Sequence, residues 1–443
     1  MGRRGVDRAR TERSAMAHPR RDYGMDAMQT GDTELIRAIN RFHVLDTIRQ
    51  FEPISRAEIG ERTQLSRTTV SAIITALLDE GVIYYDEGEA PGGAAKSIVG
   101  RGRPRVLLRM NPNAAYVVGA KLSMHQVSIT VTNLRADPLS CLVLPVRTWR
   151  LGAALIADLL EDGIRATVAK AGITMAQIAG VGVGLPGFID SVAGIAHWSP
   201  ILAAEPAPVP LARMLSDRLG VSAVIENDAN LVTLAERWFG HGQGVDNFVV
   251  VTVEAGIGMG LFLNGDLYRG HHGMGTEFGH SKIDRNGPLC RCGQYGCVEA
   301  FTADYAILRE ARKIVDLPPT DDEPSIEAAV REITRRAREG HEGLLAVFAT
   351  AGEILGLGIA NLVNVIDPGK VIISGAGMRA ADLLEPAVRA AVAANSLRVL
   401  NGRCEIIFHD WTDEVWARGA ASLVLQGLYR LPWSRNARIE MAI

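Results

Sequence analysis

The sequence predicts an α/β protein in which a small helical unit with two short strands precedes a larger domain of alternating strands and helices. Two observations predict this order. Up to about residue 110 the apolar residues recur mainly at helical spacing, whereas from Ala115 onward apolar strands alternate with amphipathic helices. The chain has 443 residues, of which 47% are hydrophobic, and this is enough to build at least two separate cores.

Charge and hydropathy limit the classes of function. The formal net charge is only -3, so any affinity for nucleic acid must come from a local basic surface. We expect no apolar run long enough to span a bilayer and no secretion leader. The sequence therefore predicts a cytoplasmic protein without a membrane partner.

Residues 1–30 are rich in arginine and contain few aliphatic side chains. Because such a segment cannot bury enough apolar surface to offset the entropy of ordering, we predict a disordered basic tail. Two interpretations stay open. The tail is an arm that grips DNA phosphates, or it is a solvated extension, which includes a translation start assigned too early, before Met16, Met25 or Met28.

Residues 31–110 follow the order of a winged helix-turn-helix domain. Apolar residues at helical spacing predict a first helix over Asp32–Gln50. Ser55 and Glu58 then have the spacing of a capping box, in which each side chain accepts a hydrogen bond from the other residue's backbone amide. A short second helix is therefore predicted to end near Arg62.

A third helix begins after Ser66, its predicted cap, and turns polar side chains outward. Such side chains donate to phosphates and base edges, which suits a recognition helix in the major groove. The predicted DNA-binding residues of this helix are Ser66, Arg67, Thr68, Thr69 and Ser71.

Two strands over residues 82–85 and 105–109, joined by glycine- and alanine-rich residues 88–102, predict a wing. Its guanidinium groups suit phosphates or a narrow minor groove. The predicted wing contacts are Arg101, Arg103 and Arg105. Because capping box, polar helix and basic wing occur in order, we predict a DNA-binding domain; the alternative is a protein-docking module with a solvated loop.

Residues 114–443 alternate between apolar strands and amphipathic helices. Strands are predicted over 116–122, 127–132, 178–183, 222–226, 248–253, 259–263, 371–374 and 405–408. Helices are predicted near 151–171, 209–219, 229–239, 303–314, 326–339, 343–366, 379–394 and 412–429.

Three of the five cysteines crowd into one segment of this domain, close to a histidine; the four residues are His280, Cys290, Cys292 and Cys297. One imidazole and three thiolates form a closed tetrahedral set for Zn²⁺, so we predict a structural zinc site with no open position. Gly293 and Gly296 would let the short loop fold back. The alternatives are a redox pair of cysteines and an ordinary buried histidine.

Four further motifs stand at strand ends: residues 184–187 (GLPG), 226–230 (ENDAN), 254–260 (EAGIGMG) and 275–280 (GTEFGH). With these and the segment Cys290–Glu299, the sequence resembles the ROK family, which groups repressors and sugar kinases. The resemblance extends from the predicted winged helix through Cys404. It implies that residues 114–443 form a two-lobed, actin-like (ribonuclease H-like) domain of the sugar-kinase type, with the C-terminal helix packing back on the first lobe.

The resemblance also implies a sugar site made of Gly187, Asn227, Asp228, Glu277, His280 and Glu299. Short polar side chains and carboxylates suit the vicinal hydroxyls of a sugar. In the family's kinases the residue matching Asp228 is the base that deprotonates the attacking hydroxyl. Two alternatives stay open: Asp228 caps the helix that begins there, and Glu299 is a surface charge.

The family's kinases open this domain with an Asp followed by a Gly-Gly-Thr turn, but here Gly119–His125 has neither the carboxylate nor paired glycines. Gly256–Gly260 keeps a second glycine loop, yet Glu254 puts negative charge where phosphate needs donors. The Trp-containing loop that often covers the sugar in the family is shifted and apolar at His197–Glu205. We therefore predict a sensor and no enzyme; the alternative is an ATP-dependent sugar kinase with an appended DNA-binding head.

These features together predict a sugar-responsive transcription regulator, a repressor of genes for carbohydrate uptake or catabolism. Its predicted partners are palindromic operator DNA, a small-molecule sugar effector and further copies of the chain in a homodimer or homotetramer.

Overall fold

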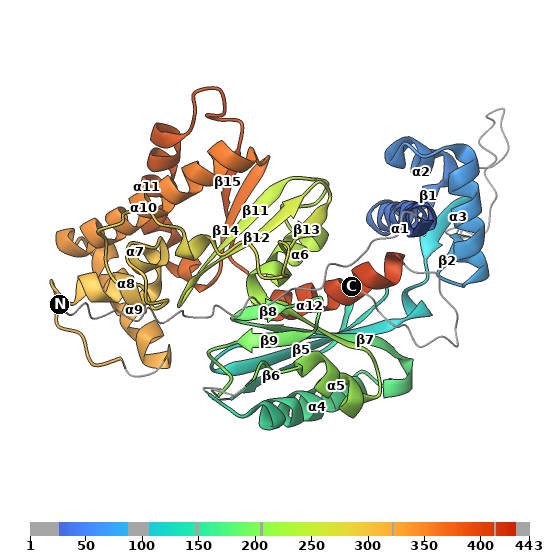
Figure 1. Ribbon diagram of the computed structural model, residues 1–443, viewed down its shortest axis with the longest axis horizontal. Helices are drawn as coiled ribbons and strands as arrows, with labels where there is room; N and C mark the ends of the chain where they lie inside the picture. The colour runs from blue at the N-terminus through green and yellow to red at the C-terminus, as the bar shows by residue number, and fades with distance from the viewer. Residues whose placement is uncertain are drawn as a thin grey trace, which may run out of the picture.

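The computed structural model describes residues 26–86, 106–146, 150–203, 207–320, 323–411 and 413–430. Figure 1 shows a small head in blue, a first lobe in cyan and green, and a second lobe in yellow and orange. The last helix, in red, runs over the first lobe toward the head (Figure 1).

The head consists of three helices and a small antiparallel sheet. The helices are α1 (Asp26–Phe51), α2 (Arg56–Thr63) and α3 (Arg67–Asp79), and the strands are β1 (Ile54–Ser55), β2 (Ile83–Asp86) and β3 (Leu107–Met110). The strand order is β1-β3-β2. Helix α1 begins at Asp26 rather than Asp32, so it extends into the region predicted to be a disordered tail.

Strands β2 and β3 pair antiparallel, which is the base that a wing requires. The predicted wing contacts Arg101, Arg103 and Arg105 lie outside the described residues, as does the basic tail as far as residue 25.

The first lobe is built on a sheet with the order β10-β7-β4-β5-β6. Its strands are β4 (Tyr116–Leu122), β5 (Gln126–Asn133), β6 (Pro138–Pro145), β7 (Ile178–Leu185) and β10 (Ala223–Asn227). Helices α4 (Ala153–Lys170) and α5 (Leu211–Leu219) cover one face, and α12 (Asp413–Arg430) covers the other. Because both faces are covered, the central strands are continuous apolar runs.

Helix α12 lies directly on the backbone of the first sheet. A Cβ atom on Gly119 would come within 1.9 Å of the Ala417 carbonyl oxygen, and one on Gly182 within 2.1 Å of the Ala420 oxygen. These two glycines are therefore explained by the close approach of α12.

The second lobe has a sheet with the order β13-β12-β11-β14-β15. Its strands are β11 (Phe248–Val253), β12 (Ile257–Leu263), β13 (Asp266–Tyr268), β14 (Lys370–Ser374) and β15 (Glu405–Phe408). Helix α6 (Asp228–Phe239) packs on one face. Helices α10 (Glu342–Ile366) and α11 (Ala381–Asn395) pack on the other, beside α7 (Glu299–Thr302), α8 (Asp304–Ala311) and α9 (Glu323–Arg338).

The structure contains strands at sheet edges and in a hairpin that the sequence analysis does not predict. They include the edge strands β6 and β13 and the hairpin of β8 (Phe188–Asp190) and β9 (Ile195–Trp198). Such strands bury too few side chains to produce a clear apolar pattern; in β6, for example, Leu139 and Val143 are exposed.

Among the described helices, α10 is long and apolar enough to cross a membrane by length and composition, which corrects the expectation that the chain has no such run. A buried core helix meets the same criterion. In the structure Phe348, Leu355 and Ile359 of α10 are buried in the core of the second lobe.

Candidate functional site

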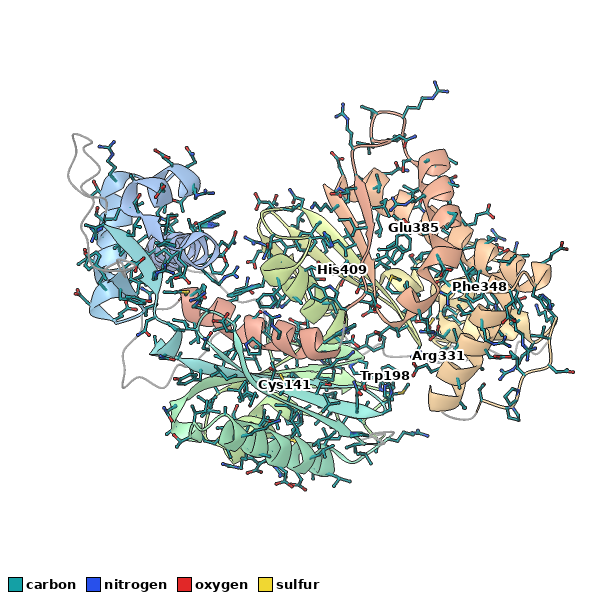
Figure 2. The ribbon with its side chains drawn as sticks, turned by 180° about the vertical axis from the view of Figure 1, so that it is seen from behind. Cys141, Trp198, Arg331, Phe348, Glu385 and His409 are labelled. Carbon is teal, nitrogen blue, oxygen red and sulfur yellow. The ribbon has the colours of Figure 1, made fainter. Side chains whose placement is uncertain are left out.

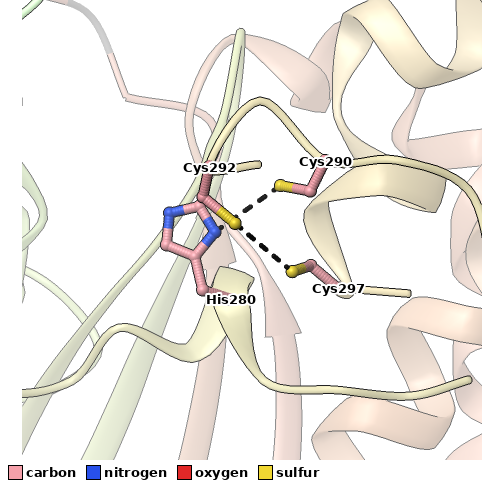
Figure 3. A group of neighbouring side chains, drawn as sticks. All are labelled: His280, Cys290, Cys292 and Cys297. Carbon is pink, nitrogen blue, oxygen red and sulfur yellow. Dashed lines mark hydrogen bonds between the residues drawn. The ribbon is translucent and has the colours of Figure 1, made fainter. Parts of the chain in front are cut away.

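The four predicted metal ligands converge in the second lobe. The ligand atoms of His280, Cys290, Cys292 and Cys297 all lie within 4.8 Å of one another. The Cys292 and Cys297 sulfurs are 3.7 Å apart, and Nδ1 of His280 is 3.7 Å from the Cys290 sulfur (Figure 3). Zn–S bonds of about 2.3 Å at tetrahedral angles place two sulfurs about 3.8 Å apart. The cluster therefore has the dimensions of a site for a metal ion such as zinc.

The backbone of the metal loop depends on its glycines. Gly293 and Gly296 both have positive φ, +83° and +70°. A Cβ atom on Gly296 would lie 1.5 Å from the carbonyl oxygen of Asp284, so only glycine lets the loop close against that segment. The predicted fold-back of the loop is confirmed at these two residues.

The electrostatics of the cluster favour a cation. Burial raises the pKa of the Cys290 thiol to about 12, so this sulfur would stay protonated unless a positive charge stabilised its thiolate. Lys282 supplies one such charge, since its Nζ donates to the Cys297 sulfur at 2.9 Å. A bound divalent ion would supply a larger one.

A cavity lies beside this cluster, between the β8–β9 hairpin, the start of α6 and the loop after β13. Of the predicted sugar residues, Gly187, Asn227 and Glu277 line it. The side-chain amide of Asn227 donates to the Gly187 carbonyl at 3.0 Å, which fixes the two elements relative to each other. Asp228, His280 and Glu299 do not line the cavity wall.

Asp228 and Glu299 nevertheless act electrostatically on the cavity. Partial burial, followed by the charges of Asp228 and Glu299, raises the pKa of Glu277 to about 7, although the residue keeps contact with solvent. Burial also raises the pKa of Asp228, although the ammonium of Lys121 opposes that shift. Three carboxyl groups therefore lie close enough together to receive the hydroxyl donors of a polar ligand.

The structure bears on two alternatives from the sequence: that Asp228 caps a helix, and that Glu299 is a surface charge. The cap of α6 is Asn227, whose Oδ1 accepts from Ala229 N, and Asp228 accepts from the same amide at 2.9 Å, so capping accounts for one Asp228 oxygen. Glu299 is not a surface charge, because only 7% of it is exposed. Its carboxylate lies 3.5 Å from the Cys290 sulfur and accepts from Ile257 N at 3.3 Å, so it joins the metal loop to the glycine loop.

The turn that holds phosphate in sugar kinases differs in charge as well as in shape. Lys121 stands near the end of β4, is 5% exposed, and has its Nζ 3.4 Å from the centre of the Trp416 ring. Glu254 packs against the Gly375 turn, and its Oε1 accepts from Ala376 N at 3.4 Å. Glu254, which precedes the glycine loop Gly256–Gly260, thus takes up the backbone donor of Ala376 and places negative charge beside that loop.

The sequence analysis missed an internal ion pair that supports the cavity. Glu226 is fully buried and accepts from Arg269 Nε at 2.7 Å, and its other oxygen accepts from Asn230 at 2.9 Å. Arg269 begins the loop that leads to Glu277. A glutamate inside an apolar strand requires a buried partner, and this was the signal available in the sequence.

Trp198 lies at the end of β9, and Figure 2 places it where the two lobes face each other. Its indole is 55% exposed and packs against Phe188, with 5.6 Å between ring centres. The backbone of Trp198 also leaves room only for glycine at position 187, since a Cβ atom on Gly187 would come within 2.2 Å of the Trp198 carbonyl oxygen.

The head presents the predicted recognition helix. Ser66 caps α3 by accepting from Thr69 N at 3.1 Å, and its hydroxyl lies 2.8 Å from that of Thr69. These two hydroxyls therefore have a structural role. Arg67, Thr68 and Ser71 are exposed on the same helix. The capping box of Ser55 and Glu58 is present at the start of α2, as predicted.

Comparison with known families agrees with this division of the chain. The model of the ROK family matches residues 143–427, and the model of the MarR family matches residues 39–85. The second match falls on the helices of the head.

Two curated relatives span nearly the whole chain. The putative xylose repressor of Caldicellulosiruptor sp. (strain Rt8B.4) is 29% identical over 411 residues, which cover 91% of this chain and 99% of that protein. The DNA-binding transcriptional dual regulator NagC of Escherichia coli (strain K12) is 26% identical over 402 residues, which cover 90% and 95%.

Solved structures show the same architecture. A ROK family transcriptional regulator described as a homologue of the E. coli MLC protein superposes with a TM-score of 0.73 at 26% identity, covering 89% of this chain and 97% of that one. A ROK hexokinase from Thermus thermophilus superposes with a TM-score of 0.58 at 28% identity, covering 69% of this chain and 97% of that one. The predicted winged helix-turn-helix with a two-lobed sugar-kinase-type domain is confirmed.

Proposed function

The chain belongs to the ROK family, and from this premise we propose that it is a sugar-responsive transcription regulator, a repressor of genes for carbohydrate uptake or catabolism. The head binds operator DNA through α3 and the wing. The sugar effector binds in the cavity that Gly187, Asn227 and Glu277 line, and further contacts to Asp228, His280 and Glu299 complete the proposed site.

One observation carries this proposal: a cavity lined by Asn227 and Glu277 stands in the same chain as an exposed, capped recognition helix, while β4 carries Lys121 where the family's kinases carry a carboxylate. A kinase needs a carboxylate there to position magnesium, and an ammonium group repels the metal. A sensor needs only the sugar-binding residues.

We further propose that the cluster holds structural Zn²⁺. The ion would bind Nδ1 of His280 and leave the Nε2 side of the ring for the sugar. The protein would act in the cytoplasm, where its DNA is, as a homodimer or homotetramer whose two heads meet the halves of a palindrome.

The test measures binding of the full chain to its own promoter region and to random DNA by fluorescence anisotropy, over a range of salt concentrations. We expect a preference for the promoter and a strong salt dependence. Arg67→Ala should weaken binding and flatten the salt dependence by about 0.9 in slope for each phosphate contact that is lost. Arg331→Ala, on exposed α9, is the matched control.

Absence of any salt-sensitive preference for the promoter would contradict the proposal. The kinase alternative is favoured by Asp228 and the surviving glycine loop, and coupled ATP turnover over a panel of hexoses, pentoses and amino sugars tests it. Turnover that Asp228→Asn abolishes would establish the kinase instead.

A further inference from the structure

Helix α6 has one end at the cavity and the other at the DNA-binding head. Its cap, Asn227, lines the cavity and donates to Gly187 on the β8–β9 side. The helix then runs for 12 residues, about 18 Å, to Phe239. Figure 1 shows it between the second sheet and α12.

The last turn of α6 contacts α1 of the head through charged groups. Arg237 donates to Oδ2 of Asp46 at 3.2 Å, and Arg49 donates to Oδ1 of the same carboxylate at 2.8 Å. The Arg49 guanidinium also lies 4.3 Å from the centre of the Trp238 ring. We call Asp46, Arg49, Arg237 and Trp238 the head joint.

The head joint is desolvated. The side chains of Asp46 and Arg49 are each only 8% exposed, and that of Arg237 is 14% exposed. A buried carboxylate with two guanidinium partners is costly to break from one side, because the remaining charges are left unpaired. The joint therefore favours discrete arrangements, docked or released, over gradual loosening.

Other groups surround the joint. Gln50 donates to Oδ2 of Asp46 at 2.7 Å. Tyr429 of α12 packs on Trp238, with 5.3 Å between ring centres, and its hydroxyl donates to the Leu134 carbonyl of the first lobe at 2.7 Å. The head, α6, α12 and the first lobe thus meet within one set of contacts.

The neighbouring residue Glu236 ties the same turn to the connection between β15 and α12. It is fully buried and accepts from Nδ1 of His409 at 2.7 Å, from the Trp411 indole and from His241 N at 2.8 Å. That connection is where the chain leaves the second lobe for α12 (Figure 2 labels His409).

Between its two ends α6 is packed too tightly to bend. A Cβ atom on Gly260 of β12 would come within 1.9 Å of the Thr233 hydroxyl, and one on Gly419 of α12 within 2.3 Å of the Leu231 oxygen. Since packed interiors shift between discrete arrangements and do not deform continuously, a displacement at Asn227 moves the whole helix.

We infer that α6 transmits sugar binding to the DNA-binding head, and that the head joint is where it acts. The inference rests on the proposed function and adds its regulation. A sugar that pulls on Asn227 and Asp228 would move Arg237 and Trp238 against α1, and so change the position of α3. Arg237 and Asp46 are positioning residues here, since neither lines the cavity and neither belongs to α3.

The experiment measures the ratio of DNA affinities with and without sugar, using the full chain, its promoter fragment, and D-xylose, D-glucose and N-acetyl-D-glucosamine as separate probes. Couplings of this kind are typically about 5–150-fold. In Arg237→Ala the ratio should fall below about 2-fold, while the sugar affinity from calorimetry stays close to that of the unmodified protein. Arg213→Ala, an exposed arginine on α5, is the matched control and should keep the ratio.

Hydrogen exchange with DNA as the only ligand gives a second readout. Because coupling is reciprocal, the promoter fragment should change amide exchange at residues 227–230 in the unmodified protein and not in Arg237→Ala. Arg237→Lys keeps the positive charge but loses the planar guanidinium group, so it should restore part of the coupling. This variant serves as the test if Arg237→Ala does not fold.

The outcomes separate the inference from the function it rests on. An undiminished ratio and unchanged exchange at 227–230 in Arg237→Ala would overturn the inference alone, as would a purely structural effect, in which the melting temperature falls and the ratio persists. If the unmodified protein shows no preference for its promoter, or none of the sugars affects it, the proposed function fails together with the inference.

Discussion

At Lys121, near the end of β4, the chain carries a cation where the family's kinases carry a carboxylate, and the charge of this cation acts on Asp228. The Lys121 ammonium offsets the charge of the Asp228 carboxylate beside the cavity, so no metal ion is needed there to balance that charge. Such single positions decide the chemistry of the site, because the fold is shared by regulators and kinases.

Glu277 provides a prediction at this scale. Its pKa is about 7 in the folded protein and 4.5 in an unfolded chain, so ionisation opposes folding. The unmodified protein should lose stability as the pH rises from 4.5 to 7, whereas Glu277→Gln should not. At pH 8 the variant should melt higher, by about 2–4 °C for each kcal/mol gained, in calorimetric scans. An equal difference at pH 5 and pH 8 would contradict this reading.

The four residues of the metal cluster could be named from the sequence. His280 and the three cysteines were predictable, because ligand type and close spacing restrict what such a group can do. The Glu226–Arg269 pair was not, since 43 residues separate its members and no local pattern links them. Carboxylates from separate elements shift one another's pKa when the fold brings them close together, and no local sequence pattern reveals such a shift.

At the scale of elements, the loop from His280 to Cys297 has little core of its own. Cys290 and Cys297 form a small hydrophobic cluster with Ala300, separate from the larger cores. Gly296 and the contact of Glu299 with the glycine loop order this element, and a bound metal would add to that order.

Removing the metal should loosen this element before the rest of the protein. We expect EDTA, or Cys297→Ser, to speed hydrogen exchange over residues 280–298 and to lower sugar affinity, since His280 and Glu277 lose their support. A metal present at 100 times its Kd stabilises the native state by about 2.7 kcal/mol. Cys141→Ser, in the first lobe (Figure 2), is the control, and elemental analysis should show zinc lost only from Cys297→Ser. Unchanged exchange after complete metal removal would refute a structural role.

At the scale of the whole molecule, the head is attached to the body by α1, α12 and the end of α6. A dimer would hold two such heads at a set distance, so that operator recognition depends on the spacing between half-sites as well as on their sequence.

Half-site spacing therefore provides a further prediction. Inserting about 5 base pairs between the operator halves, half a helical turn, should place one head on the wrong face of the DNA and reduce binding to that of a single half-site. Inserting about 10 base pairs should recover part of the affinity. Gel-shift titrations with the three spacings measure this, and equal affinities would show that each head binds alone.

The sequence by itself determined the capped helices of the head, the alternation of strands and helices, and the residues of the metal cluster. These follow from rules that act over a few residues, such as the Ser55–Glu58 box or the close spacing of His280 and the cysteines. Only the tertiary structure decided which elements touch. Asp46 and Arg237 stand 191 residues apart, and nothing in either segment specifies the other. Their contact depends on how α6 is packed between two sheets and α12, which is a property of the assembled core.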